Sequence, residues 1–308
     1  MEILKLYPVC KNYIWGGMKL KEIYGKQTEL TPVAESWELS FHPDGPTRVA
    51  DGRTLEEVLP REMWGENGKR FDRFPMLIKL IDAAQNLSVQ VHPSDAYALA
   101  NENSYGKTEA WYIVAAEPGA GIYLGFKRDV TPEEYEGAIK DGTLTDLLHF
   151  YEVKPGECYF IPAGTIHAIG AGCLICEVQQ NSNLTYRVFD YGRVDKNGNP
   201  RELHVEKALR VTNLKKYEKL APLAGVSGQD VLAECEYFRA TRLVVRGKCE
   251  KTVGGDSFLS LTCMRGEGEI VTHAVRAGES FLVPAGYGAL QLSGDMELLC
   301  AEIPEVQV

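Results

Sequence analysis

The chain has 308 residues, a length typical of about two domains, each long enough to bury its own hydrophobic core. Its 33 Lys and Arg residues against 43 Asp and Glu residues give a formal net charge of −10, which disfavours nucleic acid and anionic lipid as partners. The 8 cysteines are too sparse for a secreted disulfide scaffold, and residues 1–10 lack the apolar core of a signal peptide, so we expect a cytoplasmic protein that binds neither nucleic acid nor membrane.

The first elements in chain order are a short helix and a strand with one polar face. A capping box at Thr54 predicts that a helix begins there. Residues 87–93 alternate with period two, which is typical of a strand. On such a strand Ser88, Gln90 and His92 face one side, where their polar groups are placed to converge on a ligand.

The next segment predicts a second polar-faced strand between two helices. Ser94 is expected to begin a helix. Lys107 and Glu109 stand two positions apart, so they share one face of a strand that continues through residues 110–116. Thr131 begins another capping box, with proline at the first helical position.

Residues 158–176 form a stretch of nineteen residues without a charge, which is long enough to span a bilayer. Its prolines, glycines and histidine favour short buried strands joined by turns instead. Cys173 and Cys176 resemble half of a zinc or redox motif, but no second pair follows. Because positions i and i+3 of a strand face opposite sides, we expect two buried thiols.

An internal repeat relates two segments of the chain. Residues 153–164 (VKPGECYFIPAG) match residues 275–286 (VRAGESFLVPAG), and each copy predicts a turn, a short strand and a Pro-Ala-Gly reversal. Short strands with such turns indicate a sandwich or barrel. When the two copies are aligned, His167 of the first copy corresponds to Ala289 of the second. We therefore expect the catalytic chemistry in the first copy.

The repeat implies two related domains of unequal size. A fourth helix is expected over residues 204–211, and residues 215–229 have the composition of a linker. We therefore predict a metal-binding domain over residues 1–218 and a second, degenerate domain over residues 219–308.

Four polar residues from these segments could form a metal site. Gln90, His92, Glu109 and His167 offer an amide oxygen, two imidazole nitrogens and a carboxylate, a donor set suited to zinc or a similar divalent ion. The alternative is that each histidine is a hydrogen-bonded structural residue, which is the commoner role of a single strand histidine. The shared strand face and the asymmetry of the repeat favour the metal site.

The sequence resembles a type I mannose-6-phosphate isomerase of the short bacterial form. The resemblance runs through most of residues 1–215 and rests on segments 15–17, 34–40, 75–79, 87–93, 106–112, 162–167 and 180–187. It implies a mainly β fold of two cupin-type (jelly-roll) barrels in tandem with a few short helices. It also implies an aldose–ketose isomerase that interconverts mannose 6-phosphate and fructose 6-phosphate, a small-molecule sugar phosphate being its partner.

The resemblance also implies roles for individual residues. It assigns one Zn²⁺ per chain to the four candidate ligands, which are Gln90, His92, Glu109 and His167. It matches Arg187 to a catalytic arginine, Lys107, Glu177 and Arg193 to residues of the substrate pocket, and Ser88 to a serine near the sugar phosphate. Longer members carry an acid four residues before the arginine, where this chain has Asn183, so a proton-transfer role for that acid does not carry over.

The implied reaction moves a proton between C2 and C1 through an enediolate. With Glu109 ionised and three neutral ligands, a zinc site has net charge +1, which suits negative charge developing on the substrate oxygens. Lys107, Glu177 and a water on the metal are each chemically possible as the group that moves the proton. An iron-dependent cupin dioxygenase and a non-catalytic sugar-binding cupin remain as alternatives, and the sequence leaves the oligomeric state open.

Overall fold

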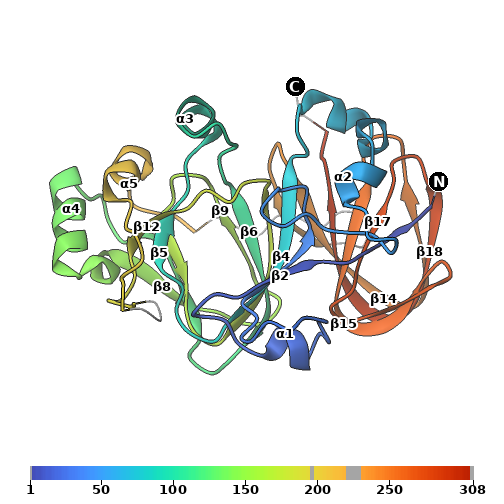
Figure 1. The fold of residues 1–308 in the computed structure, drawn as a ribbon, viewed down its shortest axis with the longest axis horizontal. Helices are drawn as coiled ribbons and strands as arrows, with labels where there is room; N and C mark the ends of the chain where they lie inside the picture. The colour runs from blue at the N-terminus through green and yellow to red at the C-terminus, as the bar shows by residue number, and fades with distance from the viewer. Residues whose placement is uncertain (1, 195–197, 220–229, 306–308) are drawn as a thin grey trace.

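We describe the fold from a computed structural model, which covers residues 2–194, 198–219 and 230–305. These residues form three antiparallel sheets and a few short helices at the periphery (Figure 1). The prediction of a mainly β chain is therefore confirmed. Over the described ranges, no helix is both long enough and apolar enough to cross a membrane.

Two of the sheets face each other in the first two thirds of the chain. The six-stranded sheet has the order β2 (Val9–Lys11), β3 (Glu35–Leu39), β4 (Met76–Ala83), β11 (Cys173–Gln180), β6 (Glu109–Ala116) and β9 (Cys158–Ile161). The five-stranded sheet has the order β12 (Tyr186–Phe189), β5 (Val89–Val91), β10 (His167–Ile169), β7 (Gly121–Phe126) and β8 (Leu148–Glu152). Buried side chains of both sheets belong to one apolar cluster, among them Ile113 and Ile122.

The third sheet is built mainly from the C-terminal part of the chain. Its order is β1 (Leu4–Leu6), β17 (Ser280–Val283), β15 (Leu259–Ile270), β18 (Gly288–Glu302), β14 (Arg239–Val253) and β13 (Asp230–Glu234), with β16 (His273–Arg276) beside β15. The first strand of the chain therefore lies at an edge of the C-terminal sheet, where it pairs with β17 (Figure 1).

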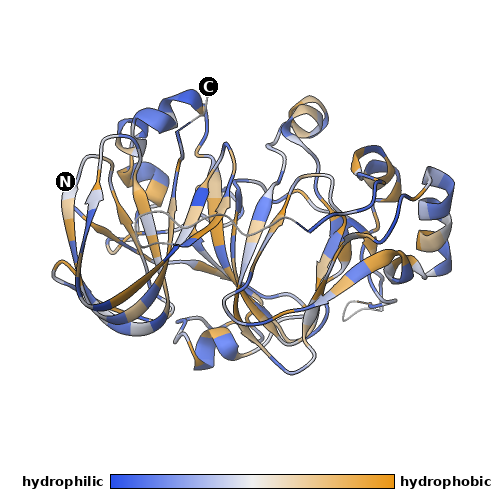
Figure 2. Cartoon of the chain, turned by 180° about the vertical axis from the view of Figure 1, so that it is seen from behind, coloured by the Kyte–Doolittle hydropathy of each residue, from blue (hydrophilic) through white to orange (hydrophobic). Residues whose placement is uncertain are grey.

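The six-stranded sheet stands in the middle of the molecule and is buried on both faces. On β6, Tyr112 and Val114 pack in the cluster shared with the C-terminal sheet. Trp111 and Ile113 of the same strand pack in the cluster shared with the five-stranded sheet. Because strand side chains alternate, one sheet serves both halves of the molecule. Figure 2 shows hydrophobic residues (orange) among the strands in the middle of the molecule.

All four predicted helices are present. They are α2 (Leu55–Val58), α3 (Asp95–Asn101), α4 (Pro132–Asp141) and α5 (Val205–Val211). Thr54 and Glu57 form the expected capping box, and the Thr131 hydroxyl accepts a hydrogen bond from the Glu134 amide. Local side chains therefore fix where α2 and α4 begin.

The structure also contains elements that no sequence pattern predicts, namely α1 (Lys19–Glu22) and the 3₁₀ turns Arg61–Trp64, Glu66–Arg70 and Leu144–Leu147. In α1 the Lys19 amide donates to the Asp82 carboxylate at 2.8 Å, a cap supplied by β4 sixty-three residues away. A cap that comes from another strand leaves no signal in the local sequence.

The two copies of the repeat have the same local structure. Their strands, β9 and β17, begin at equivalent positions. Gly156 and Gly278 both have positive φ, as the turns require. In each turn the glutamate that follows accepts from a backbone amide three residues earlier, Glu157 from Lys154 and Glu279 from Arg276.

The uncharged segment and the linker agree with expectation as far as they are described. Residues 158–176 form β9, β10 and the first half of β11. Cys173 and Cys176 are buried free thiols that belong to different apolar clusters, on opposite faces of β11. Residues 215–219 contain no helix or strand, and the rest of the predicted linker, 220–229, lies outside the described residues.

Candidate active site

Strand register aligns the candidate residues of the five-stranded sheet. Gln90 on β5 pairs with His167 on β10 and with Arg187 on β12, so the three residues form a row across the sheet. His92 follows two positions after Gln90, on the polar face that the sequence predicts. Residues far apart in the chain are thus neighbours because three antiparallel strands are in this register.

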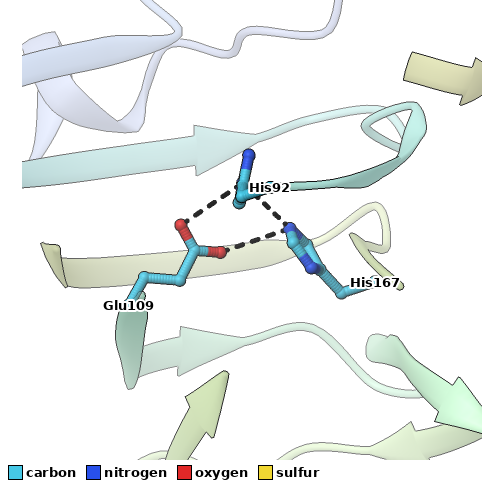
Figure 3. A group of neighbouring side chains, drawn as sticks. All are labelled: His92, Glu109 and His167. Carbon is cyan, nitrogen blue, oxygen red and sulfur yellow. Dashed lines mark hydrogen bonds and ion pairs between the residues drawn. The ribbon is translucent and has the colours of Figure 1, made fainter. Parts of the chain in front are cut away.

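The histidines and Glu109 converge on one point. The Nε2 atoms of His92 and His167 lie 3.2 Å apart. Glu109 Oε2 lies 3.6 Å from His92 Nε2, and Oε1 lies 3.3 Å from His167 Nε2. All three side chains are buried and point toward one another, His92 from the end of β5, Glu109 from β6 and His167 from β10 (Figure 3).

Hydrogen bonds to the backbone determine the tautomer of both histidines. His92 Nδ1 lies 2.8 Å from the Leu184 carbonyl oxygen, and His167 Nδ1 lies 2.8 Å from the Thr165 carbonyl oxygen. A carbonyl only accepts, so each Nδ1 carries the proton. Burial lowers the pKa of both rings, that of His167 to about 4, so they are neutral at pH 7. Each Nε2 therefore presents a lone pair to the common point.

This arrangement fits a bound cation. Two lone pairs 3.2 Å apart repel each other, and Glu109 Oε1 is buried without a hydrogen-bond partner among the described residues. Burial raises the pKa of Glu109, although Lys107 Nζ, 2.9 Å from Oε2, opposes that rise. A divalent ion would accept the two nitrogen lone pairs and favour the ionised carboxylate.

Gln90 lies beside this cluster. Its Nε2 is 3.4 Å from His167 Nε2, and the residue also lines the neighbouring cavity. Rotation of the amide by 180° exchanges its nitrogen and oxygen, which brings Oε1 to the position of a ligand. The structure therefore brings together all four residues proposed as ligands.

A row of charged and aromatic residues lies on the six-stranded sheet. Register places Trp37, Lys79, Glu177 and Trp111 side by side on β3, β4, β11 and β6. Trp111 Nε1 donates to Glu177 Oε2 at 2.8 Å. Lys79 Nζ and Lys107 Nζ lie 3.4 Å and 4.0 Å from Glu177 Oε1. Burial alone would raise the pKa of Glu177, but these two lysines lower it overall, so Glu177 is ionised.

A cavity of about 290 Å³ lies between the two sheets and is lined by members of both rows, Gln90 and Arg187 from the first and Lys79, Glu177 and Trp111 from the second. Its charged lining residues are Glu35, Lys79, Lys107, Glu177, Arg187 and Arg201. Four cations against two carboxylates give its wall a net charge of +2. The other residues that line it are Tyr13, Trp15, Ile81, Leu87, Ser88, Gln90, Trp111, Ile169, Asn183 and Thr185.

Arg187 and Arg201 line one part of the cavity, which we call its arginine end. Arg187 Nε donates to Ser88 Oγ at 3.2 Å, and Nη1 donates to the Glu202 carbonyl at 2.9 Å. Arg193 is not among the residues that line the cavity. It lies behind Asp190, to which it donates, and its guanidinium stacks on Tyr191.

Sequence reasoning missed several residues of the cavity wall. A single lysine in the apolar run of residues 76–81 is a signal that could have identified Lys79 as functional. Nothing local marks Glu35 or Arg201, because they reach the cavity only through the packing of distant segments. Asn183 lines the cavity and donates to the Asp44 carboxylate at 2.8 Å.

Comparison with known proteins identifies the family. Residues 3–118 match the phosphomannose isomerase type I catalytic domain, and residues 229–303 match the mannose-6-phosphate isomerase cupin domain. The mannose-6-phosphate isomerase ManA of Bacillus subtilis is 35% identical over 316 residues, which cover 98% of this chain and 99% of ManA.

Solved structures agree with this result. The crystal structure of mannose 6-phosphate isomerase from Bacillus subtilis superposes with a TM-score of 0.89 at 34% identity, covering 98% of this chain and 100% of that one. A mannose 6-phosphate isomerase solved with zinc and yttrium shares the fold, with a TM-score of 0.80 at 19% identity over 99% of this chain and 100% of that one. The cupin-type fold is thus confirmed, and the chain belongs to the type I phosphomannose isomerase family.

Proposed function

We propose that this protein is a zinc-dependent mannose-6-phosphate isomerase that interconverts mannose 6-phosphate and fructose 6-phosphate. The observation that carries the proposal is a buried His–His–Glu cluster beside a cationic cavity between the two sheets. Family membership supplies the substrate, since the relatives are mannose-6-phosphate isomerases over nearly the whole chain.

The donor set supports zinc as the cation. His92 and His167 offer neutral nitrogens, and Glu109 and Gln90 offer oxygens, a combination that suits zinc. When bound, zinc supplies a positive charge that stabilises negative charge developing on a substrate oxygen.

The distribution of charge orients the substrate. Arg187 and Ser88 lie at one end of the cavity, where a phosphate dianion binds. Lys107 lines the same cavity beside the candidate metal ligands, 2.9 Å from Glu109 Oε2. A sugar phosphate held by its phosphate therefore extends its C1–C2 end toward the metal cluster. By resemblance, Arg193 also belongs to the substrate site, and it acts there through Asp190.

Lys107 and Glu177 are the side chains that we assign to the proton transfer. They face each other at 4.0 Å within the cavity, and Glu177 is held ionised by two lysines. The transfer between C2 and C1 passes through an enediolate, whose negative charge Lys107 and Arg187 stabilise. The positive cavity also explains how a chain of net charge −10 binds an anion, because the local field decides binding.

A coupled assay tests the function. We expect purified protein to convert mannose 6-phosphate to fructose 6-phosphate, to lose this activity with a chelator and to regain it with added zinc. Metal analysis should find one zinc per chain. Binding of mannose 6-phosphate without turnover would instead identify a sugar-binding protein. Iron in the preparation together with oxygen consumption would identify a dioxygenase.

We also propose that residues 1–218 form the metal-binding domain and residues 219–308 the degenerate domain. Among the residues that the structure describes, the candidate metal ligands and the lining of the cavity all belong to the first segment. Strand β1 belongs to the first segment in sequence, but it pairs with β17 of the second segment.

A further inference from the structure

We propose that Arg201 is a second phosphate-binding arginine of the substrate cavity, held in place by Asp190 as a positioning residue. The inference rests on the proposed function, in which the cavity accepts a sugar phosphate. It assigns to Arg201 a direct contact that the sequence motifs do not indicate.

The geometry of Arg201 leaves one side of its guanidinium for a ligand. Arg201 Nε donates to Asp190 Oδ2 at 2.7 Å, and Nη2 donates to Oδ1 at 2.5 Å. This bidentate pair fixes the plane of the guanidinium. The third nitrogen, Nη1, donates to none of the described residues. Because Arg201 lines the cavity, Nη1 is available to a ligand there.

Arg193, in contrast, has no nitrogen left without a partner. Its Nε donates to Asp190, its Nη1 donates to the Asn86 carbonyl at 2.5 Å, and its Nη2 pairs with Asp190 as well. Its face covers the Tyr191 ring, 5.3 Å from the ring centroid. Every nitrogen of Arg193 is therefore occupied, and the residue supports Asp190 from behind the cavity wall.

The local charge favours an anion. Arg193 and Arg201 pair with the buried carboxylate of Asp190, and Arg187 lies close enough to feel its charge; together these four groups carry a net charge of +2. Burial and the charge of Arg201 lower the pKa of Arg187, so the two arginines are close enough to repel each other. A sugar phosphate carries a charge of about −1.5 to −2 at pH 7, which matches this excess.

Steady-state kinetics of the zinc-loaded enzyme tests the inference. We expect Arg201→Ala to raise KM for mannose 6-phosphate about 10- to 100-fold and to leave kcat within about threefold. Inorganic phosphate, used as a competitive inhibitor, should lose affinity to a similar extent. Arg201→Lys keeps the charge without the bidentate pair, so it should raise KM by an intermediate amount. This conservative variant tests the same contact if the alanine variant fails to fold.

A double-mutant cycle tests the positioning role of Asp190. Asp190→Asn should also raise KM, but in the Arg201→Ala background it should add little, because its effect passes through Arg201. Arg128→Ala is the matched control, since this exposed arginine pairs with Glu134 on α4 far from the cavity.

The outcomes separate this inference from the proposed function. If the parent enzyme is active and Arg201→Ala keeps its KM and its phosphate inhibition, Arg201 does not bind phosphate. If the parent enzyme has no activity, the proposed function fails. In that case titration calorimetry with inorganic phosphate still compares the parent with Arg201→Ala, and equal affinity overturns the inference.

Discussion

At the scale of single residues, the backbone orients the histidines of the His92–Glu109–His167 cluster. The carbonyls of Leu184 and Thr165 hold the Nδ1 protons of the two histidines, so that both Nε2 atoms are bare. Hydrogen bonds of this kind raise the basicity of a histidine ligand and fix its orientation. The two backbone carbonyls, and not the histidines alone, therefore make the cluster suitable for a cation.

Removal of one histidine should release the metal. We expect His167→Ala to lower the zinc content well below one per chain and to abolish turnover, because two nitrogens and a carboxylate set the affinity. Metal analysis after dialysis is the measurement. His273→Ala, on β16 of the C-terminal sheet, should keep its zinc. A His167→Ala variant with a full complement of zinc would reject this set of ligands.

Arg187 should matter for turnover and not for the metal. Its guanidinium contacts Ser88 at the arginine end of the cavity and no member of the metal cluster. We expect Arg187→Ala to lower kcat/KM about 10²- to 10³-fold while one zinc per chain remains bound. Unchanged activity would contradict the role assigned to Arg187.

At the scale of elements, register creates the active site. Period-two alternation is enough to predict that Ser88, Gln90 and His92 share a face, and the structure agrees. Alternation does not predict which strands are neighbours. The row from Trp37 to Trp111 exists only because β3, β4, β11 and β6 pair in one register. The sequence therefore could not predict that Lys79 and Glu177 are neighbours.

The repeat offers a matched pair of glycines for a stability test. Gly156 and Gly278 have φ of +93° and +87°, so alanine costs about 1–2 kcal/mol of backbone strain at either. A Cβ at Gly278 would lie 2.5 Å from Tyr24 Cβ, whereas at Gly156 the nearest atom is Arg242 Nη1 at 3.7 Å.

We therefore expect Gly278→Ala to lower the free energy of unfolding by about 1–3 kcal/mol more than Gly156→Ala. Denaturant unfolding of the two variants is the measurement. Equal losses would mean that the contact with Tyr24 is relieved at no cost.

At the scale of the whole molecule, a buried polar network joins the two halves. Lys26 Nζ donates to Glu38 Oε1 at 2.5 Å and to the Gly278 carbonyl at 2.6 Å. Ser280 Oγ donates to Glu38 Oε2 at 2.7 Å. Glu38 lies on β3, three residues from Glu35 of the cavity wall. The C-terminal sheet thus supports the strand that carries part of the active site.

Loss of the buried cation should be costly. Lys26→Met leaves Glu38 charged and buried, so we expect a loss of about 3–5 kcal/mol in the free energy of unfolding. The half-exposed pair of Lys5 with Glu279 is the control, and Lys5→Met should cost about 1 kcal/mol or less. Adding Glu38→Gln to Lys26→Met should recover part of the loss. Similar costs for Lys26→Met and Lys5→Met would contradict the role of burial.

Local sequence patterns predict α2 to α5, the polar strand faces and the candidate ligands, but not α1 or the 3₁₀ turns. Strand alternation, helix caps and the repeat depend on neighbouring residues, so they are visible in the chain, and the candidate ligands follow from them. The tautomers of the histidines, the place of Arg201 in the cavity and the pairing of β1 with the C-terminal sheet become visible only in three dimensions. Each of these depends on a contact between segments far apart in the chain, and local propensity contains no information about such contacts.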